Sequence, residues 1–299
     1  MDSAMLVIEV GIDPEIRDFG GLLLTWHGVF TALGIAAGVW AALVMARRLG
    51  IVDDDVYSGA LIAIPAGIVG ARALFVIERW NTSTVDTVGD IFRINEGGIS
   101  IWGAILGGLL GAMAYAWIRK LPMLRAFDVL TFGGILGMAI GRIGDLINGE
   151  HFAEPSSLPW AIRYTHLNSP SVLGHPECGL GQVFGVPVGE LCAQHPAVGY
   201  EMIGDLLIFG LAIVAFRYLR IDGIVGFGTL LLYSLMRFGV SELRLDSREI
   251  IAGLTTPQVT SLFMIAAGVV GLAYVLRRGR AEPGADRPAV AAQARAPSG

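Results

Sequence analysis

Arginines and carboxylates stand inside stretches of this sequence that are otherwise apolar. Arg142 and Asp145 share one stretch, three residues apart on one helix face, and Glu201 and Arg237 lie in two others. An arginine at the centre of a bilayer costs at least ~2.5–3.5 kcal/mol, so each needs a partner or a wet cavity. Guanidinium groups donate paired hydrogen bonds to phosphate. The pattern predicts a buried anion site, for a lipid phosphate or a transported anion.

Helical spacing groups further charges with this set. Asp205 follows Glu201 by four residues, and Arg244 follows Arg237 by seven, so each pair shares a helix face. Structural ion pairs that lock helices together are the alternative interpretation. Charges inside membrane spans are functional by default, which favours a binding or catalytic site.

The elements that carry these charges are predicted to be transmembrane helices. The chain is 54% apolar and only 16% charged, with a mean hydropathy of +0.64, whereas soluble domains carry about 25% charged residues. A helical span needs about 20 apolar residues. We therefore expect an all-α integral membrane protein with about seven transmembrane helices. The uninterrupted spans are 19–46, 97–118 and 250–276, and those interrupted by charges are 57–77, 126–147, 197–218 and 222–243.

Basic residues predict the orientation, because cytoplasmic loops are enriched in Lys and Arg. One set of loops holds Arg47, Arg48, Arg119, Lys120, Arg125, Arg217, Arg220, Arg277, Arg278, Arg280, Arg287 and Arg295. The other set, which has more residues, holds only Arg17, Arg79, Arg93, Arg163, Arg244 and Arg248. The N-terminus is therefore expected outside and the C-terminus in the cytoplasm, in a plasma (bacterial inner) membrane.

The segments outside the spans have different compositions. Residues 1–20 lack the basic region of a signal peptide, and we interpret them as an interfacial segment. Residues 21–278 form the predicted membrane domain, with a small external cap at 148–196 between the fourth and fifth helices. The cap contains Cys178 and Cys192, which either form a disulfide or remain as thiols. Residues 279–299 are predicted to be a disordered cytoplasmic tail.

Glycines recur at four-residue spacing in two predicted helices. They are Gly103, Gly107 and Gly111 in the third span, and Gly133, Gly137 and Gly141 in the fourth. Small residues at this spacing let helix backbones approach closely in a membrane. Tight helix packing is the prediction, and backbone near Gly97 and Gly98 is also expected to border a ligand.

Several ordered motifs resemble those of the prolipoprotein diacylglyceryl transferases. The similarity runs over roughly residues 21–276. Its motifs are Gly70-Ala71-Arg72, the run Gly97–Gly103, the run Gly141–Glu150, His195-Pro196 with Tyr200-Glu201, and Arg237 with Arg244–Ser247.

The resemblance implies an enzyme that moves the diacylglyceryl group of phosphatidylglycerol to the lipobox cysteine of a preprolipoprotein. A thioether forms and glycerol phosphate leaves, with no metal or organic cofactor. Because a free thiol has a pKa near ~8.5, nearby arginines and a base would assist the attack. Arg142 and Arg237 would stabilise the charge on the leaving phosphate. The motifs do not identify the base.

The predicted site follows from the resemblance together with the charges. The catalytic candidates are Arg142, Arg237, His27, Asp145 and Glu150. The candidates for phosphatidylglycerol binding are Arg142, Asn148, Gly97, Gly98, Arg72, Arg244, Glu242, Tyr200 and Glu201.

Four positions depart from the family pattern. His27 replaces a Tyr, Asp145 an Asn and Ala153 a Gly, and Ser241 stands where an acid is usual, with Glu242 next to it. Trp102 occupies a position often held by His, where Trp is an accepted variant. We hypothesise that His27 and Asp145 form a base pair that replaces Tyr and Asn.

Three rival functions make different predictions. An anion transporter requires internal repeats, and none is visible between the halves. An intramembrane aspartyl protease requires Gly-x-Gly-Asp, but Arg142 replaces its first glycine. A paralogue that binds lipid without transfer remains open because of the departures. The histidines at 151, 166 and 175 share one loop, but their spacing matches no zinc pattern, and no metal is expected.

Overall fold

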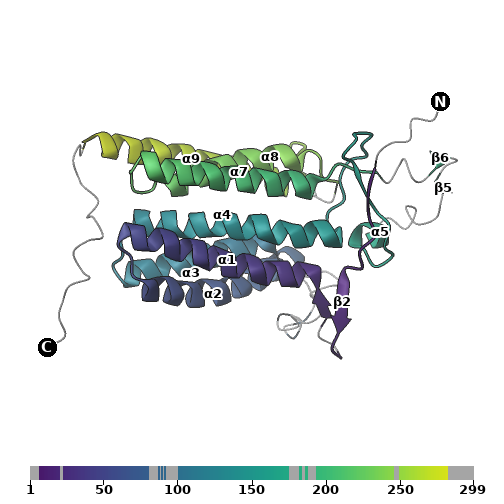
Figure 1. Ribbon diagram of the computed structural model, residues 1–299, viewed down its shortest axis with the longest axis horizontal. Coiled ribbons are helices and arrows are strands. Elements are labelled where there is room, and N and C mark those ends of the chain that lie inside the picture. The colour runs from purple at the N-terminus through teal and green to yellow at the C-terminus, as the bar shows by residue number, and fades with distance from the viewer. Residues whose placement is uncertain are drawn as a thin grey trace. The chain divides into compact units, whose positions relative to one another are not determined.

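The computed structural model describes residues 7–20, 23–80, 87, 89, 91, 100–174, 182–183, 186–187, 193–245 and 249–281 (Figure 1). Long helices make up most of these residues. They are α1 (Trp26–Leu49), α2 (Asp53–Arg79), α3 (Ile101–Ile118), α4 (Met123–Asn148), α7 (Ala197–Tyr218), α8 (Ile224–Ser241) and α9 (Thr256–Ala281), with the short α5 (Pro170–Gly174) between α4 and α7.

The helices have the length and composition of membrane spans. Within the described residues, six of them are long and apolar enough to cross a bilayer, and the described apolar part of α3, Gly103–Ile118, is shorter. The prediction of an all-α integral membrane protein is therefore confirmed, with the seventh span resting on α3. Many large apolar side chains on these helices are exposed, as expected where lipid is the solvent.

The chain divides into two compact units. The described part of the first lies within residues 1–38 and 132–279, and that of the second lies mainly within 39–131. In the second unit α2 packs along α3. In the first unit α7 packs along α8, and α8 contacts α9 where Gly268 and Gly271 face Leu231 and Phe227. Apart from Arg72, Gly97 and Gly98, the predicted site residues belong to the first unit.

Two helices begin later than the sequence predicts. Residues before α1 form the hairpin of β2 (Glu15–Asp18) and β3 (Leu23–Thr25), and residues before α9 form that of β7 (Glu249–Ile251) and β8 (Leu254–Thr255). Capping residues set both starts. The Thr25 hydroxyl accepts a hydrogen bond from the Gly28 amide at 3.1 Å, and Gln258 accepts from the Thr255 amide at 2.8 Å. The predicted starts at 19 and 250 were therefore wrong.

The segment after α4 folds back on the end of that helix (Figure 1). Its strand β4 (Ile162–Tyr164) pairs in parallel with β1 (Ile8–Val10), which ties the N-terminal segment to it. The Tyr164 hydroxyl donates to the Leu146 carbonyl oxygen at 2.8 Å, and burial raises the pKa of this tyrosine. Strands β5 (Gln182–Val183) and β6 (Val186–Pro187) form a short ladder. Cys178, Cys192 and the tail from residue 282 lie outside the described residues.

Glycine contacts bring α1 and α4 together in the first unit. A Cβ added to Gly34 would lie 2.5 Å from the Gly137 carbonyl oxygen, and one added to Gly38 would lie 2.8 Å from that of Gly133. A Cβ added to Gly141 would meet nothing within 4 Å, although the Gly141 amide nitrogen would lie 3.4 Å from a Cβ added to Gly34. In the second unit, Gly103, Gly107 and Gly111 face α2 in the same way. Most of the glycine pattern thus serves helix packing.

We expect Gly34→Ala to destabilise the protein by about 1–3 kcal/mol, because the new methyl group would collide with backbone that cannot move aside. Thermal unfolding of the purified protein in detergent measures this as a lower melting temperature. Gly134→Ala is the matched control, since a Cβ there meets nothing within 4 Å. Equal melting temperatures for the two variants would contradict the assignment.

Candidate active site

The functional candidates of the first unit gather at one end of its helices. Arg142 and Asp145 lie in the last two turns of α4, and Glu201 lies in the second turn of α7. Arg237 lies in the last two turns of α8, and His27 lies in the first turn of α1. The ion pairs described below join these four helix ends.

Glu201 is the centre of the arginine cluster. Its side chain is only 1% exposed. Arg142 Nη2 lies 2.8 Å from Oε2, Arg237 Nη1 forms an ion pair with Oε1, and Arg244 Nη1 lies 3.5 Å from Oε1. Three guanidinium groups from two helices and the turn after α8 therefore share one buried carboxylate.

The cluster carries more positive charge than Glu201 can balance. Arg142 has a second partner in Asp145, whose Oδ2 accepts from Nη1 at 2.9 Å. Arg237 and Arg244 are buried as well, at 6% and 8% exposure. Three guanidinium groups at one buried site are suited to hold an anion that replaces Glu201 as their shared partner, because desolvated charges interact strongly.

Two more side chains that are not among the listed catalytic and binding candidates stand beside Arg142. Asp205 is fully buried one turn after Glu201, and within the described residues its two oxygens have no hydrogen-bond partner. Tyr233 on α8 lies next to the Arg142 guanidinium. The only sequence signal for Asp205 was its four-residue spacing from Glu201. Nothing in the apolar stretch around Tyr233 singled it out.

His27 faces the C-terminal end of α4. Its Nδ1 lies 2.6 Å from Asp145 Oδ1 and 3.5 Å from Glu150 Oε1. Glu150 Oε1 also accepts from Asn148 Nδ2 at 3.0 Å. The structure thus brings together His27 and Asp145, which the sequence analysis linked as a hypothesis.

His27, Asp145 and Glu150 present potential metal-ligand atoms within 4.8 Å of one another. The same Asp145 carboxylate already accepts a hydrogen bond from the Arg142 guanidinium. A neighbouring positive charge opposes a second cation on that carboxylate. The donor set therefore suits a hydrogen-bonded His–Asp pair better than a metal ion.

Two of the loop histidines have partners in the structure. His151 Nδ1 lies 2.8 Å from Arg244 Nη2, so this residue borders the arginine cluster. His151 was considered from the sequence only as a metal ligand, although its place directly after Glu150 was a signal for the site. His166 lies away from the cluster, and its Nε2 is 3.7 Å from Oδ2 of Asp13 in the N-terminal segment. His175 lies outside the described residues.

Tyr200 and Glu242, both predicted to bind lipid, have their own partners. The Tyr200 hydroxyl accepts from Trp160 Nε1 at 2.8 Å and lies 3.2 Å from His195 Nδ1. Glu242 is exposed and accepts from Gln258 Nε2 at 2.5 Å. These hydrogen bonds join Tyr200 and Glu242 to side chains outside the arginine cluster.

The other predicted lipid ligands lie in the second unit or outside the description. Arg72 donates from Nε to the Ile91 carbonyl oxygen at 2.9 Å, and its guanidinium stacks over Phe75 at 5.2 Å. Gly97 and Gly98 are not among the described residues.

The small residues at departure positions are well packed. Ala153 is fully buried, and its amide donates to Gln194 Oε1 at 2.6 Å. Ser241 is 1% exposed and donates to the Arg237 carbonyl oxygen at 2.6 Å. The hydroxyl therefore fills its space without adding the charge that an acid would bring to the cluster.

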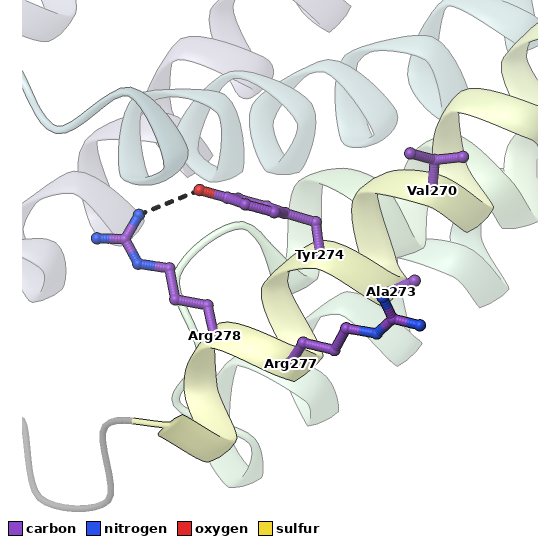
Figure 2. Close-up of a pocket in the computed structure, with 5 residues that line it drawn as sticks. All are labelled: Val270, Ala273, Tyr274, Arg277 and Arg278. Carbon is purple, nitrogen blue, oxygen red and sulfur yellow. Dashed lines mark hydrogen bonds between the residues drawn. The ribbon is translucent and has the colours of Figure 1, made fainter.

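An open pocket of about 710 Å³ lies elsewhere, along the C-terminal half of α9 (Figure 2). Its lining residues are Val270, Ala273, Tyr274, Arg277 and Arg278, and Arg278 Nη1 donates to the Tyr274 hydroxyl at 3.4 Å. It contains none of the predicted site residues. Gln258, the α9 residue that contacts Glu242, lies at the other end of that helix, so this pocket is separate from the candidate active site.

Comparisons with known proteins show which family the chain is similar to. The family model described as prolipoprotein diacylglyceryl transferase matches residues 14–274. The phosphatidylglycerol–prolipoprotein diacylglyceryl transferase of Clostridioides difficile is 32% identical over 260 residues, which cover 87% of this chain and 94% of that protein. The proteins of the same name from Symbiobacterium thermophilum and Corynebacterium efficiens are each 33% identical. The matches cover 89% and 92% of this chain, and 94% and 85% of those proteins.

The family model covers every residue of the arginine cluster and the His27–Asp145 pair. The relatives align over nearly their full lengths, so the similarity concerns the whole membrane domain rather than a fragment. This chain belongs to the prolipoprotein diacylglyceryl transferase family.

Proposed function

We propose that this protein transfers the diacylglyceryl group of phosphatidylglycerol to the lipobox cysteine thiol of a preprolipoprotein. The reaction forms a thioether and releases glycerol phosphate, and it is the first step of bacterial lipoprotein maturation. The observation that carries the proposal is the convergence of three arginines on Glu201, in a chain whose relatives bear the name of this activity.

Arg142 and Arg237 are the residues that bind the phosphate in this proposal. Each now contacts Glu201, and an incoming phosphate offers oxygens that accept the same hydrogen bonds. When the C–O bond to phosphate breaks, the leaving monoester gains negative charge, which fixed guanidinium groups stabilise. Arg244 adds positive charge from the same side of Glu201.

Asn148 is suited to the glycerol part of the lipid head group. Its side chain is buried, and its Oδ1 has no hydrogen-bond partner among the described residues. A buried amide oxygen without a partner costs about 1–3 kcal/mol, which a glycerol hydroxyl would offset by donating to it. Glu150 accepts a hydrogen bond from the nitrogen of this amide. Its catalytic role stays a prediction. The lipid roles of Gly97, Gly98, Arg72, Tyr200, Glu201 and Glu242 stay predictions.

The basic residues support a specific placement in the bacterial inner membrane. The ends opposite the active site carry Arg47, Arg48, Arg217, Arg277 and Arg278, and such ends face the cytoplasm. The active site then opens near the outer face, where the lipobox cysteine of a translocated precursor emerges. A reporter that is active only in the cytoplasm should therefore be active when it is fused to the C-terminus, and a reporter that is active only outside should not.

The direct test uses the purified protein in nanodiscs that contain phosphatidylglycerol, incubated with a lipobox peptide. We expect glycerol phosphate release and a mass gain of one diacylglyceryl group on the peptide cysteine. A peptide with serine in place of the cysteine is the control, because the hydroxyl is far less nucleophilic.

A lipid-binding paralogue without transfer is the alternative. It predicts that phosphatidylglycerol binds and remains intact in the presence of the peptide. Bound lipid without release of glycerol phosphate would therefore overturn the proposal in favour of this alternative.

A further inference from the structure

The proposed transfer needs a group that takes the thiol proton, and His27 is held in place for such a task. Thr25, two residues before His27, caps the start of α1. Gly144 on α4 leaves room for this helix end, since a Cβ there would lie 2.7 Å from the His27 Cα. His27 is therefore fixed against α4 by backbone contact as well as by its side chain.

The partners of His27 determine which ring nitrogen is basic. Asp145 Oδ1 lies 2.6 Å from Nδ1, and Glu150 Oε1 lies 3.5 Å from it. Ionised carboxylates only accept hydrogen bonds, so the proton of a neutral ring belongs on Nδ1. The opposite nitrogen, Nε2, then has a free lone pair. Among the described residues it has no hydrogen-bond partner, and the side chain is 41% exposed.

Asp145 connects this histidine to the phosphate-binding arginine. Its Oδ1 faces His27, while its Oδ2 accepts from Arg142 Nη1 at 2.9 Å. The carboxylate is only 10% exposed, so both contacts hold it in one orientation. The Asp145 carboxylate thus holds His27, the proton acceptor, on one side and Arg142, the phosphate ligand, on the other.

We propose that His27, oriented by Asp145, is the general base that takes the proton of the lipobox cysteine thiol; this rests on the proposed transferase function. The thiol gives its proton to Nε2, and its sulfur forms a bond to the phosphate-bearing carbon of the diacylglyceryl group of phosphatidylglycerol. The C–O bond of that carbon breaks, and glycerol phosphate takes the electron pair. The histidinium that results lies between Asp145 and Glu150, and later returns its proton to the phosphate or to water.

Other charged groups near His27 are less suited to this task. Glu150 is occupied by Asn148 Nδ2 and also faces the ring. Asp145 is held by both His27 and Arg142, so neither oxygen is free. Asp205 is fully buried on α7, next to Arg142 rather than next to the exposed ring nitrogen. His27 combines a free basic nitrogen with access from outside.

The test measures the pH dependence of transfer by His27→Gln in phosphatidylglycerol nanodiscs. At pH 7 we expect kcat to fall by about 10²-fold, the low end of general-base effects, with the KM for lipid within twofold. Raising the pH should reduce the deficit, because a free thiol with a pKa near ~8.5 ionises without help. Asp145→Asn should show a smaller loss with the same relief by alkali.

A matched control comes from the other histidine–carboxylate contact. His166 lies 3.7 Å from Asp13, away from the arginine cluster, and His166→Gln should keep the wild-type pH profile. The melting temperature of His27→Gln itself should match that of the wild type, which checks that the loss of kcat does not come from misfolding.

Three results would overturn the proposal. These are an unchanged kcat in His27→Gln at pH 7, a loss that alkali does not relieve, or abolition of wild-type transfer by a chelator, which would assign the His27–Asp145–Glu150 donors to a metal ion. Wild-type protein without any transfer would instead refute the transferase function itself, so the two failures are distinguishable.

Discussion

Arg237→Lys is expected to lower kcat for diacylglyceryl transfer by about 10³-fold, the upper range for loss of one preorganised donor group. The lysine keeps the positive charge that Glu201 needs, so the fold should survive. It loses the planar fork that donates two parallel hydrogen bonds to phosphate. Release of glycerol phosphate in nanodiscs measures the effect, with melting temperature as the check on folding.

Arg142→Lys should act in the same way, because Arg142 uses Nη1 for Asp145 and Nη2 for Glu201, and a lysine has a single nitrogen for both. Arg217→Lys is the matched control: Arg217 is exposed near the C-terminal end of α7, opposite to the end that carries Glu201. Transfer within twofold of wild type by Arg237→Lys would show that charge alone suffices and that paired hydrogen bonds to phosphate are not used.

The arginine cluster could be predicted from sequence because charge inside an apolar span has few explanations. Arg142, Glu201 and Arg237 lie within helices whose neighbours are almost all apolar, and lipid offers such charges no partner except one another. The shared carboxylate could not be predicted, because it depends on the rotation and tilt of α4, α7 and α8.

The starts of α1 and α9 show what hydropathy alone misses. The sequence pattern counts residues 23–25 and 250–255 with the apolar spans, yet strand β3 covers 23–25, and β7, β8 and the turn between them cover 250–255. The helix starts are set by side chains that cap them: Thr25 for α1, and Gln258, which accepts from the Thr255 amide, for α9. An average over about 20 residues cannot register such single hydrogen bonds.

The two departures from the family pattern at His27 and Asp145 were more informative about the site when considered together than each was alone. An aspartate at position 145 adds negative charge beside a predicted phosphate site, which is unfavourable by itself. The structure gives that charge two partners, His27 and Arg142, in contacts of 2.6 and 2.9 Å. His151 was missed for the opposite reason: loop histidines are common at surfaces, and its contact with Arg244 joins residues far apart in the chain.

Glu201→Gln is expected to destabilise the protein by about 3–5 kcal/mol, the usual result of leaving buried charges without their partner. The glutamine has nearly the same shape but no charge, and Arg142, Arg237 and Arg244 all lose a common counter-ion. Thermal unfolding in detergent should show a fall of many degrees. Glu154→Gln is the control, because Glu154 is exposed and such surface changes usually stay within about 0.5 kcal/mol.

The same variant also tests whether a phosphate replaces Glu201 as the partner of the arginines. In the wild type an anionic head group must compete with the carboxylate, whereas in Glu201→Gln it meets arginines that have lost their shared counter-charge. Phosphatidylglycerol added to the detergent should therefore raise the melting temperature of the variant more than that of the wild type, and phosphatidylcholine, with no net charge, should not. Equal stabilisation of both proteins by phosphatidylglycerol would mean that the lipid phosphate binds elsewhere, and that these arginines serve only to join α4, α7 and α8.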